Sequence, residues 1–202
     1  MNRLRLLVIA LGIAAVVGGG VWYLSARDRP ASGTTTRDVR PVADGDGVWE
    51  ALAQRPLDLP KLAPGQTCPV TPTAEVLPGQ KLPGGGPIYP HATTDGGPLS
   101  YGGDAENGWY YMKVLWRSSG DYTGPALIRG RQLGGDQELR FGDGPSPSAA
   151  LRFPVETGVR SEFTVNGWRD NPSFTRIKSP GCYAWQVDGL DFQSVIVFEA
   201  RP

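Results

Sequence analysis

The sequence predicts an all-β fold, an antiparallel β-sandwich, preceded by one N-terminal transmembrane helix. Residues 6–24 form an uncharged apolar run, which is typical of a membrane span. From residue 47 onward, short apolar segments alternate with turn residues, and the chain holds 28 glycines and 19 prolines among its 202 residues. Two cysteines, Cys68 and Cys182, lie near the two ends of this region. Many short strands at such spacing indicate a sandwich.

The apolar run, LLVIALGIAAVVGGGVWYL, follows Arg3 and Arg5. A helix of about 19 residues rises roughly 28 Å, close to the hydrocarbon thickness of a bilayer. The aromatic pair at its far end suits the headgroup layer, and the two arginines before it keep the N-terminus in the cytoplasm. We therefore expect a cytoplasmic n-region at 1–5, a signal anchor in the lipid bilayer at 6–24, and a single-pass protein whose domain lies outside the cell membrane.

The alternative is a cleaved signal peptide followed by secretion. The apolar core of a signal peptide is usually about 7–15 residues long and precedes a site with small residues. Gly18–Gly20 and Leu24–Ala26 are the two candidate sites, but Leu24 is bulky and the apolar run continues past the glycines. No cysteine lies near the run to carry a lipoprotein anchor. A retained anchor is the favoured interpretation.

Residues 25–46 predict a flexible linker, and residues 47–202 predict one extracytoplasmic domain. The linker contains no Leu, Ile, Met or aromatic residue, so it cannot bury enough apolar surface to offset its chain entropy. The chain carries 20 basic and 20 acidic side chains, and residues 1–26 account for two of the basic ones. The exported part is therefore nearly neutral, which argues against a nucleic-acid partner.

The domain is predicted to begin with a short helix at about 47–54 and an extended segment. The helix follows an Asp-Gly start and is stopped by Pro56. Three further prolines, at positions 60, 64 and 69, then force the chain into an extended path. We expect this path to lie along the domain surface.

Period-two patterns predict the strands that follow. Such patterns, bounded by Gly, Pro, Asn or Asp, indicate half-buried antiparallel strands. The expected strands are 113–116, 125–129, 138–141, 151–155 and 159–165. A hairpin is expected from Cys182–Val187 through Asp188-Gly189 to Leu190–Ala200, because Asp-Gly between apolar strands is a strong hairpin signal. This loop would pair Val187 with Leu190 and Trp185 with Phe192.

Residues 78–108 are expected to form one long, mobile loop with a short strand at 87–89. Loops of this length are usually functional or poorly ordered. His91, the chain's one histidine, falls in this glycine- and proline-rich stretch and is expected to be solvated.

Cys68 and Cys182 are expected to form a disulfide, because thiols persist poorly after export and the cysteine count is even. No CxxC motif supports redox catalysis or zinc ligation, and His91 is the one histidine that a catalytic cysteine could use. A bridge that spans the domain with Trp116 between its cysteines resembles the immunoglobulin-like architecture. The sequence departs from that family because Tyr183 directly follows the second cysteine, so the strand topology is left open.

Three segments resemble an uncharacterised group of exported or membrane-anchored bacterial proteins. They are RPLDLPKLAPGQTCPVTP at 55–72, KVLWRSSGDYTGPALIRGRQL at 113–133, and GWRDNPSFTRIKSPGCYAWQVDGLDF at 167–192, followed by IVF at 196–198. The resemblance covers most of residues 55–200. It implies a shared fold and an extracytoplasmic location, but no established activity, so it assigns no functional residue.

The motifs of common enzymes are absent from the sequence. It has no GxSxG, no HExxH and no phosphate-binding glycine loop, and the acidic run at Asp44–Gly47 lacks the ligands of a calcium loop. We expect no catalytic residue, cofactor or metal. A two-carboxylate hydrolase is the least favoured alternative. Its available acids are expected to be turn residues: Asp121, Asp136, Asp143, Glu156, Asp170 and Asp188.

The favoured function is a structural or protein-interaction domain in the envelope, and the alternative is a carbohydrate-binding module. Trp109, Tyr110 and Trp168 are the candidate ligand-facing aromatics, since exposed rings can stack on sugars of an envelope polysaccharide. Trp168 is expected in a loop-like stretch at 166–172. The carbohydrate alternative requires the three rings to gather on one exposed face. Four other rings are expected in the core: Trp116, Tyr183, Trp185 and Phe198.

The anchor can be tested by fractionation. The full-length protein should remain with membranes after carbonate extraction, because about 19 apolar residues stay in the bilayer. Soluble mature protein that begins near residue 27 would show instead that the signal is cleaved.

Overall fold

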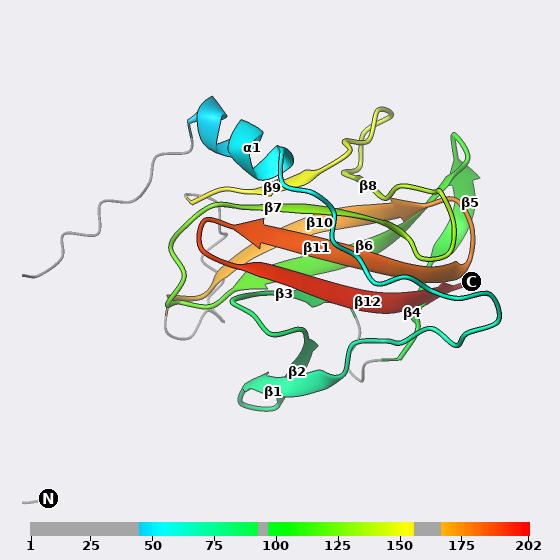
Figure 1. Cartoon of the computed structure of the whole chain (residues 1–202), viewed down its shortest axis with the longest axis horizontal. Helices are drawn as coiled ribbons and strands as arrows, with labels where there is room; N and C mark the ends of the chain where they lie inside the picture. The colour runs from blue at the N-terminus through cyan, green and yellow to red at the C-terminus, as the bar shows by residue number, and fades with distance from the viewer. Residues whose placement is uncertain (1–44, 93–96, 156–166) are drawn as a thin grey trace, which may run out of the picture. The chain divides into compact units, whose positions relative to one another are not determined.

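The computed structural model describes residues 45–92, 97–155 and 167–202 (Figure 1). The predicted anchor at 6–24, nearly all of the predicted linker, the predicted strand at 159–165 and Glu156 lie outside these residues. In the described part, no helix has the length and apolar character to cross a membrane.

The described chain is mostly β, with one helix and three sheets. Strand β1 (Thr73–Leu77) pairs with β2 (Gln80–Pro83). The second sheet, called the β6–β10 sheet, has the order β3-β6-β10-β8, with β5 also paired to β6. Its strands are β3 (Ile88–His91), β5 (Gly102–Glu106), β6 (Trp109–Ser118), β8 (Arg140–Phe141) and β10 (Arg169–Ile177).

The third sheet, called the β11–β12 sheet, has the order β4-β12-β11-β7-β9. Its strands are β4 (Leu99–Ser100), β7 (Ala126–Gln132), β9 (Leu151–Phe153), β11 (Gly181–Gly189) and β12 (Gln193–Arg201). The pairings are antiparallel except for β4, which runs parallel to β12. The predicted all-β class is thus confirmed at the level of strand content.

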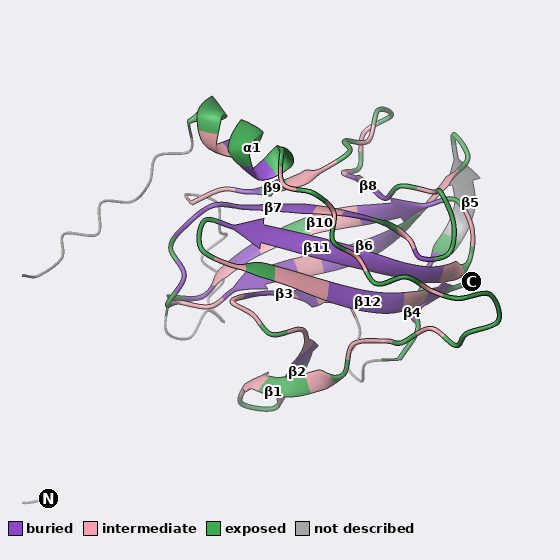
Figure 2. Ribbon diagram, in the orientation of Figure 1, coloured by how far each residue is buried: buried purple, intermediate pink, exposed green. Residues whose placement is uncertain are grey.

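Both five-stranded sheets contribute to one hydrophobic core. Trp116 of β6 meets Trp185 of β11 edge to face, with ring centroids 5.3 Å apart. Trp185 also stacks on Phe198 of β12 at 3.8 Å. These three rings and Tyr183 are each less than 5% exposed, as the sequence predicted. Figure 2 shows the buried positions running along β7 and β11.

The N-terminal strap, residues 46–71, covers the outer side of the β11–β12 sheet (Figure 1). It begins with helix α1 (Asp46–Ala53), whose Trp49 and Leu52 are three residues apart and pack together against Leu127. The extended part of the strap places Leu59 and Leu62 against a second apolar cluster, which is made by Leu133 just after β7 and by residues of β11 and β12. The predicted extended path along the surface is therefore present.

Polar contacts hold the strap in register with the sheet. The backbone N–H of Asp58 donates to Gln186 Oε1 at 2.7 Å, and Gln186 Nε2 donates to the carbonyl of Pro56 at 2.9 Å. Near the end of the strap, Thr71 N–H donates to the carbonyl of Val197, and Val197 N–H donates to Thr71 Oγ1. The strap thus exchanges hydrogen bonds with two neighbouring strands of this sheet, β11 and β12.

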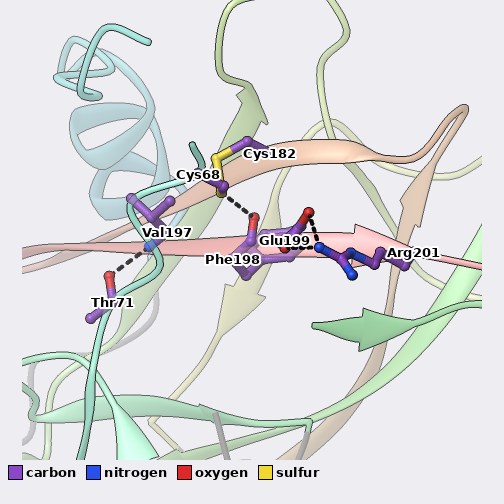
Figure 3. The surroundings of a disulfide bond; sticks show 7 residues. All are labelled: Cys68, Thr71, Cys182, Val197, Phe198, Glu199 and Arg201. Carbon is purple, nitrogen blue, oxygen red and sulfur yellow. Dashed lines mark hydrogen bonds and ion pairs between the residues drawn. A yellow bond between two sulfur atoms is a disulfide. The ribbon is translucent and has the colours of Figure 1, made fainter. Parts of the chain in front are cut away.

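The expected disulfide between Cys68 and Cys182 is present and joins the strap to β11 (Figure 3). The two Cα atoms are 5.4 Å apart, and the cysteines are separated by 114 positions in the chain. The bridge lies beside the Thr71–Val197 contact, so covalent and hydrogen-bonded attachments meet at the same place.

The predicted register of the last hairpin is wrong. Val187 pairs with Ser194 and Trp185 with Ile196, and Leu190-Asp191 forms the turn in place of Asp188-Gly189. Asp188 stays in β11 because its carboxylate is buried in an ion pair with Arg129. The register moves by an even number of residues, so the side chains that face the core are unchanged.

Two other predictions are corrected by the strands. The expected long loop at 78–108 contains β2, β3, β4 and β5, which are only two to five residues long and therefore leave weak periodic signals. The segment around Trp168 was expected to be loop-like, but β10 starts at Arg169 and contains Pro172. Proline is tolerated there because β8 pairs only with Thr175 and Arg176, which leaves that edge of β10 open at position 172.

The disulfide yields a stability prediction. A closed loop of this length is worth about 4–5 kcal/mol by the chain-entropy estimate, and measured bridges often deliver less. Replacing both cysteines by serine should lower the melting temperature by several degrees or more and leave a β-type circular dichroism spectrum. Alkylation of the exported protein, followed by mass spectrometry, should label no cysteine until reductant is added. Two labelled cysteines in the native protein would contradict the bridge.

Candidate functional site

The outer side of the β6–β10 sheet is the candidate site, because the strap covers the other five-stranded sheet. Successive residues of a strand point to opposite sides. Along β6, Met112, Val114 and Trp116 face the core. The intervening positions, from Trp109 through Tyr111 and onward to Arg117, therefore face outward. This outer side has a closed end near Arg117 and an open half near Tyr111.

The closed end contains a buried ion pair. Arg117 Nε donates to Asp170 Oδ1 at 2.9 Å, and both side chains are less than a tenth exposed. Arg117 also donates to Gln80 of β2. The Trp168 ring stacks on the Tyr89 ring, with centroids 5.9 Å apart. The Arg117 guanidinium lies over the Trp168 ring, 5.9 Å from its centroid. These contacts close this end of the sheet against solvent.

His91 lies beside this ion pair in β3 and is half-buried, so the expectation of a solvated loop residue is wrong. Burial lowers the pKa of His91 below its usual value, Arg117 lowers it further, and Asp170 opposes the shift. A histidine whose pKa is lowered by folding binds fewer protons in the folded state. Its contribution to stability is therefore present above the unfolded pKa of about 6.5 and is lost as the pH falls through the folded pKa.

The open half carries an aromatic pair with one exposed and one partly exposed ring. Tyr111 of β6 is 40% exposed and meets Phe174 of β10 edge to face, with centroids 5.4 Å apart. Leu115 and Pro172, which are direct partners in the β6–β10 register, extend this pair along the sheet. Lys113 lies opposite Phe174 and is exposed. Together these residues, 111, 113, 115, 172 and 174, make up a surface that we call the ring patch.

A hollow of about 320 Å³ adjoins the ring patch at the start of β6. It is lined by Trp109, Asp136, Gln137, Glu138, Arg140 and Lys178. The Lys178 ammonium lies 4.8 Å from the centroid of the Trp109 ring. Arg140 Nη1 donates to Glu138 Oε2 at 2.7 Å. The hollow thus combines an indole ring with two cations and two anions.

The three aromatics singled out in the sequence do not form one exposed face. Trp109 faces outward at the hollow. Tyr110, the next residue, packs against the core and lies 4.8 Å from the ring of Tyr101. Trp168 is 8% exposed and is covered at the opposite end of β6. The condition for a binding face built on these three rings is therefore not met, and only Trp109 remains a candidate.

Two of the acids expected in turns are instead buried in ion pairs. Asp170 pairs with Arg117, and Asp188 pairs with Arg129 at 2.7 Å. Asp121, Asp136 and Asp143 are exposed in connections between strands, as the sequence suggested. Across the described residues, no group of three or more His, Cys, Asp or Glu side chains has the arrangement of a metal site.

A scan against protein-family models, a search of curated proteins and a search of solved structures each found no match to the chain. The function of the candidate site is therefore inferred from the geometry of its residues.

Sequence reasoning missed Tyr111, Phe174 and the polar lining of the hollow. The strand period itself carried part of the signal, because Trp109 and Tyr111 are two residues apart and must share a side if both lie in β6. Phe174 was missed because Asn171-Pro172 was interpreted as a loop. Nothing in the sequence brings residues 136–140 to Trp109; the sheet order does so.

Proposed function

We propose that the chain is a membrane-tethered, extracytoplasmic antiparallel β-sandwich that serves as a protein-interaction domain without catalytic activity. The apolar run at 6–24 supplies the anchor, residues 25–46 supply the linker, and the domain lies outside the membrane. The uncharged run and its arginine flank support this topology. The resemblance to exported bacterial proteins agrees with the same location.

The sandwich interpretation is supported by the shared core. Residues from both five-stranded sheets pack in one cluster, and Trp116 and Trp185 meet there from different sheets. Two sheets that bury their facing sides against each other form a two-layer architecture. The covalent link from the strap to β11 further stabilises one of the layers.

The single observation that supports an interaction role is the ring patch. In the described part of the chain, Tyr111 and Leu190 are the exposed large hydrophobic residues. Leu190 stands alone in a hairpin turn, whereas Tyr111 is continuous with Phe174, Leu115 and Pro172 on a strand-paired surface. Aromatic residues are enriched at protein interfaces, where a rigid ring buries a large area at small entropic cost.

The ring patch also has a rigid base. Tyr111 lies in β6 and Phe174 in β10, the two strands that share the longest pairing in their sheet. This pairing continues without a break from the Arg169/Ser118 pair to the Ile177/Tyr110 pair. Lys113, directly opposite Phe174 in the register, adds a positive charge to the patch and can pair with an acid on the partner. A partner protein with an apolar centre and an acidic rim would complement this surface.

The proposal is tested by site-specific photocrosslinking in cells that make the full-length protein. A benzoylphenylalanine at position 111 should give one discrete envelope-protein adduct. The same group at position 190, the other exposed hydrophobic position, is the matched control and should give none. Phe174→Asp in the position-111 protein should abolish the adduct, because a charge replaces the apolar neighbour.

The absence of an adduct at position 111, or the same adduct at positions 111 and 190, would contradict an interaction role for the ring patch. Thermal unfolding of the Phe174→Asp protein serves as the control for folding, since Phe174 is only partly buried.

A further inference from the structure

We propose that the hollow beside Trp109 is a binding site for a neutral oligosaccharide. This inference is separate from the protein interaction proposed above, because it uses the lining of the hollow and not the ring patch. Its residues come from three distant segments of the chain: the start of β6, the connection between β7 and β8 with the first residue of β8, and the turn after β10.

The exposure of Trp109 is the first observation. Four other tryptophans of the described chain are each less than a tenth exposed: Trp49, Trp116, Trp168 and Trp185. Trp109 keeps an intermediate exposure and lines a hollow of about 320 Å³, at the lower end of the usual size of ligand pockets. An indole in a shallow hollow has a flat apolar face with a polar edge, which suits the C–H face of a pyranose ring. The Lys178 ammonium lies 4.8 Å from the centroid of this indole, so a sugar that stacks on that face would displace it.

The polar groups around the ring define the class of ligand. Asp136 and Glu138 oppose Arg140 and Lys178, so the formal charges of the lining cancel. The hollow therefore does not select for an anion or a cation by net charge. It offers carboxylate acceptors and guanidinium, ammonium and amide donors around one ring, and hydroxyl groups of a neutral sugar can use both kinds.

Gln137 is held in place for such a role. Its Oε1 accepts a hydrogen bond from Ser179 Oγ at 3.3 Å. The Tyr183 hydroxyl, which donates its proton to the carbonyl of Ser179 at 2.7 Å, lies 3.4 Å from the same oxygen. Its carbonyl accepts from the N–H of Gln132 at 2.7 Å, which fixes the backbone. The side-chain amide is thus oriented before a ligand arrives, and its Nε2 is the donor that a sugar hydroxyl would meet. Preorganisation of this kind reduces the entropic cost of binding.

The experiment uses the full-length protein in detergent micelles. The probes are cellotetraose, chitotetraose and maltotetraose, with tetragalacturonic acid as a charged comparison, and binding is measured by calorimetry and by saturation-transfer NMR. At least one neutral probe should bind. Trp109→Ala should weaken that binding about tenfold, the size expected for loss of one ring contact, whereas Trp109→Phe should retain most of it.

Two control variants separate this site from the rest of the molecule. Leu190→Ala, at the distant hairpin turn, should leave the affinity unchanged. Phe174→Ala removes one ring of the Tyr111–Phe174 pair and should also leave the affinity unchanged, since Phe174 does not line the hollow. Equal thermal unfolding of the Trp109→Ala and wild-type proteins shows that the loss is local.

Three results would overturn the proposal. They are no binding of any neutral probe, tighter binding of the charged probe, and unchanged affinity in Trp109→Ala. Cleavage of a probe that stops in Asp136→Asn would overturn it as well, because the hollow would then be a hydrolytic site.

Discussion

The buried carboxylate of Asp188 is the constraint on which the arrangement of the domain depends. This side chain is fully buried on the outer side of β11, where a lone charge would be strongly destabilising. Arg129 pairs with it at 2.7 Å, and Gln186 Nε2 donates to both of its oxygens. Arg129 also donates to the carbonyls of Ala53 and Arg55 in the strap. The strap therefore supplies the carbonyl acceptors for the terminal nitrogens of Arg129.

This dependence explains why the two five-stranded sheets differ. The outer side of the β11–β12 sheet carries a charged pair that needs a cover, and the strap provides carbonyls, apolar side chains and finally a disulfide. Arg55 adds a further link, because its guanidinium donates to the carbonyls of Gly189 and Leu190 at the hairpin turn. Among the described residues, the outer side of the β6–β10 sheet is closed near Arg117 and carries the exposed Tyr111 in its other half. Its open half is therefore the surface available for a partner or a ligand.

Local patterns predicted much of the fold, whereas the candidate site depended on long-range geometry. The α1 segment, the strands at β6, β7 and β11, the four core rings and the disulfide followed from periodicity, turn residues and cysteine count. The hairpin register failed because Asp188-Gly189 has the composition of a turn, and nothing local indicates that Arg129 buries Asp188 within the strand. Trp109 was identified from its aromatic neighbours, but Tyr110 was chosen beside it although adjacent strand residues face opposite sides. The pairing of Tyr111 with Phe174 required the β6–β10 register.

The central claim is that polar contacts with Gln186, Arg129 and Asp188 dock the strap, and that the disulfide only reinforces it. Residue-resolved hydrogen exchange tests this most directly in the full-length protein, in the wild type and in the variant with both cysteines replaced by serine. The amide of Asp58, which donates to Gln186, should be protected in both proteins, whereas the amide of Ala63, which donates to Gln66 at an exposed site, should exchange rapidly. The account would be contradicted if the Asp58 amide exchanged as fast as that of Ala63 in the wild type, or lost its protection when the cysteines were replaced.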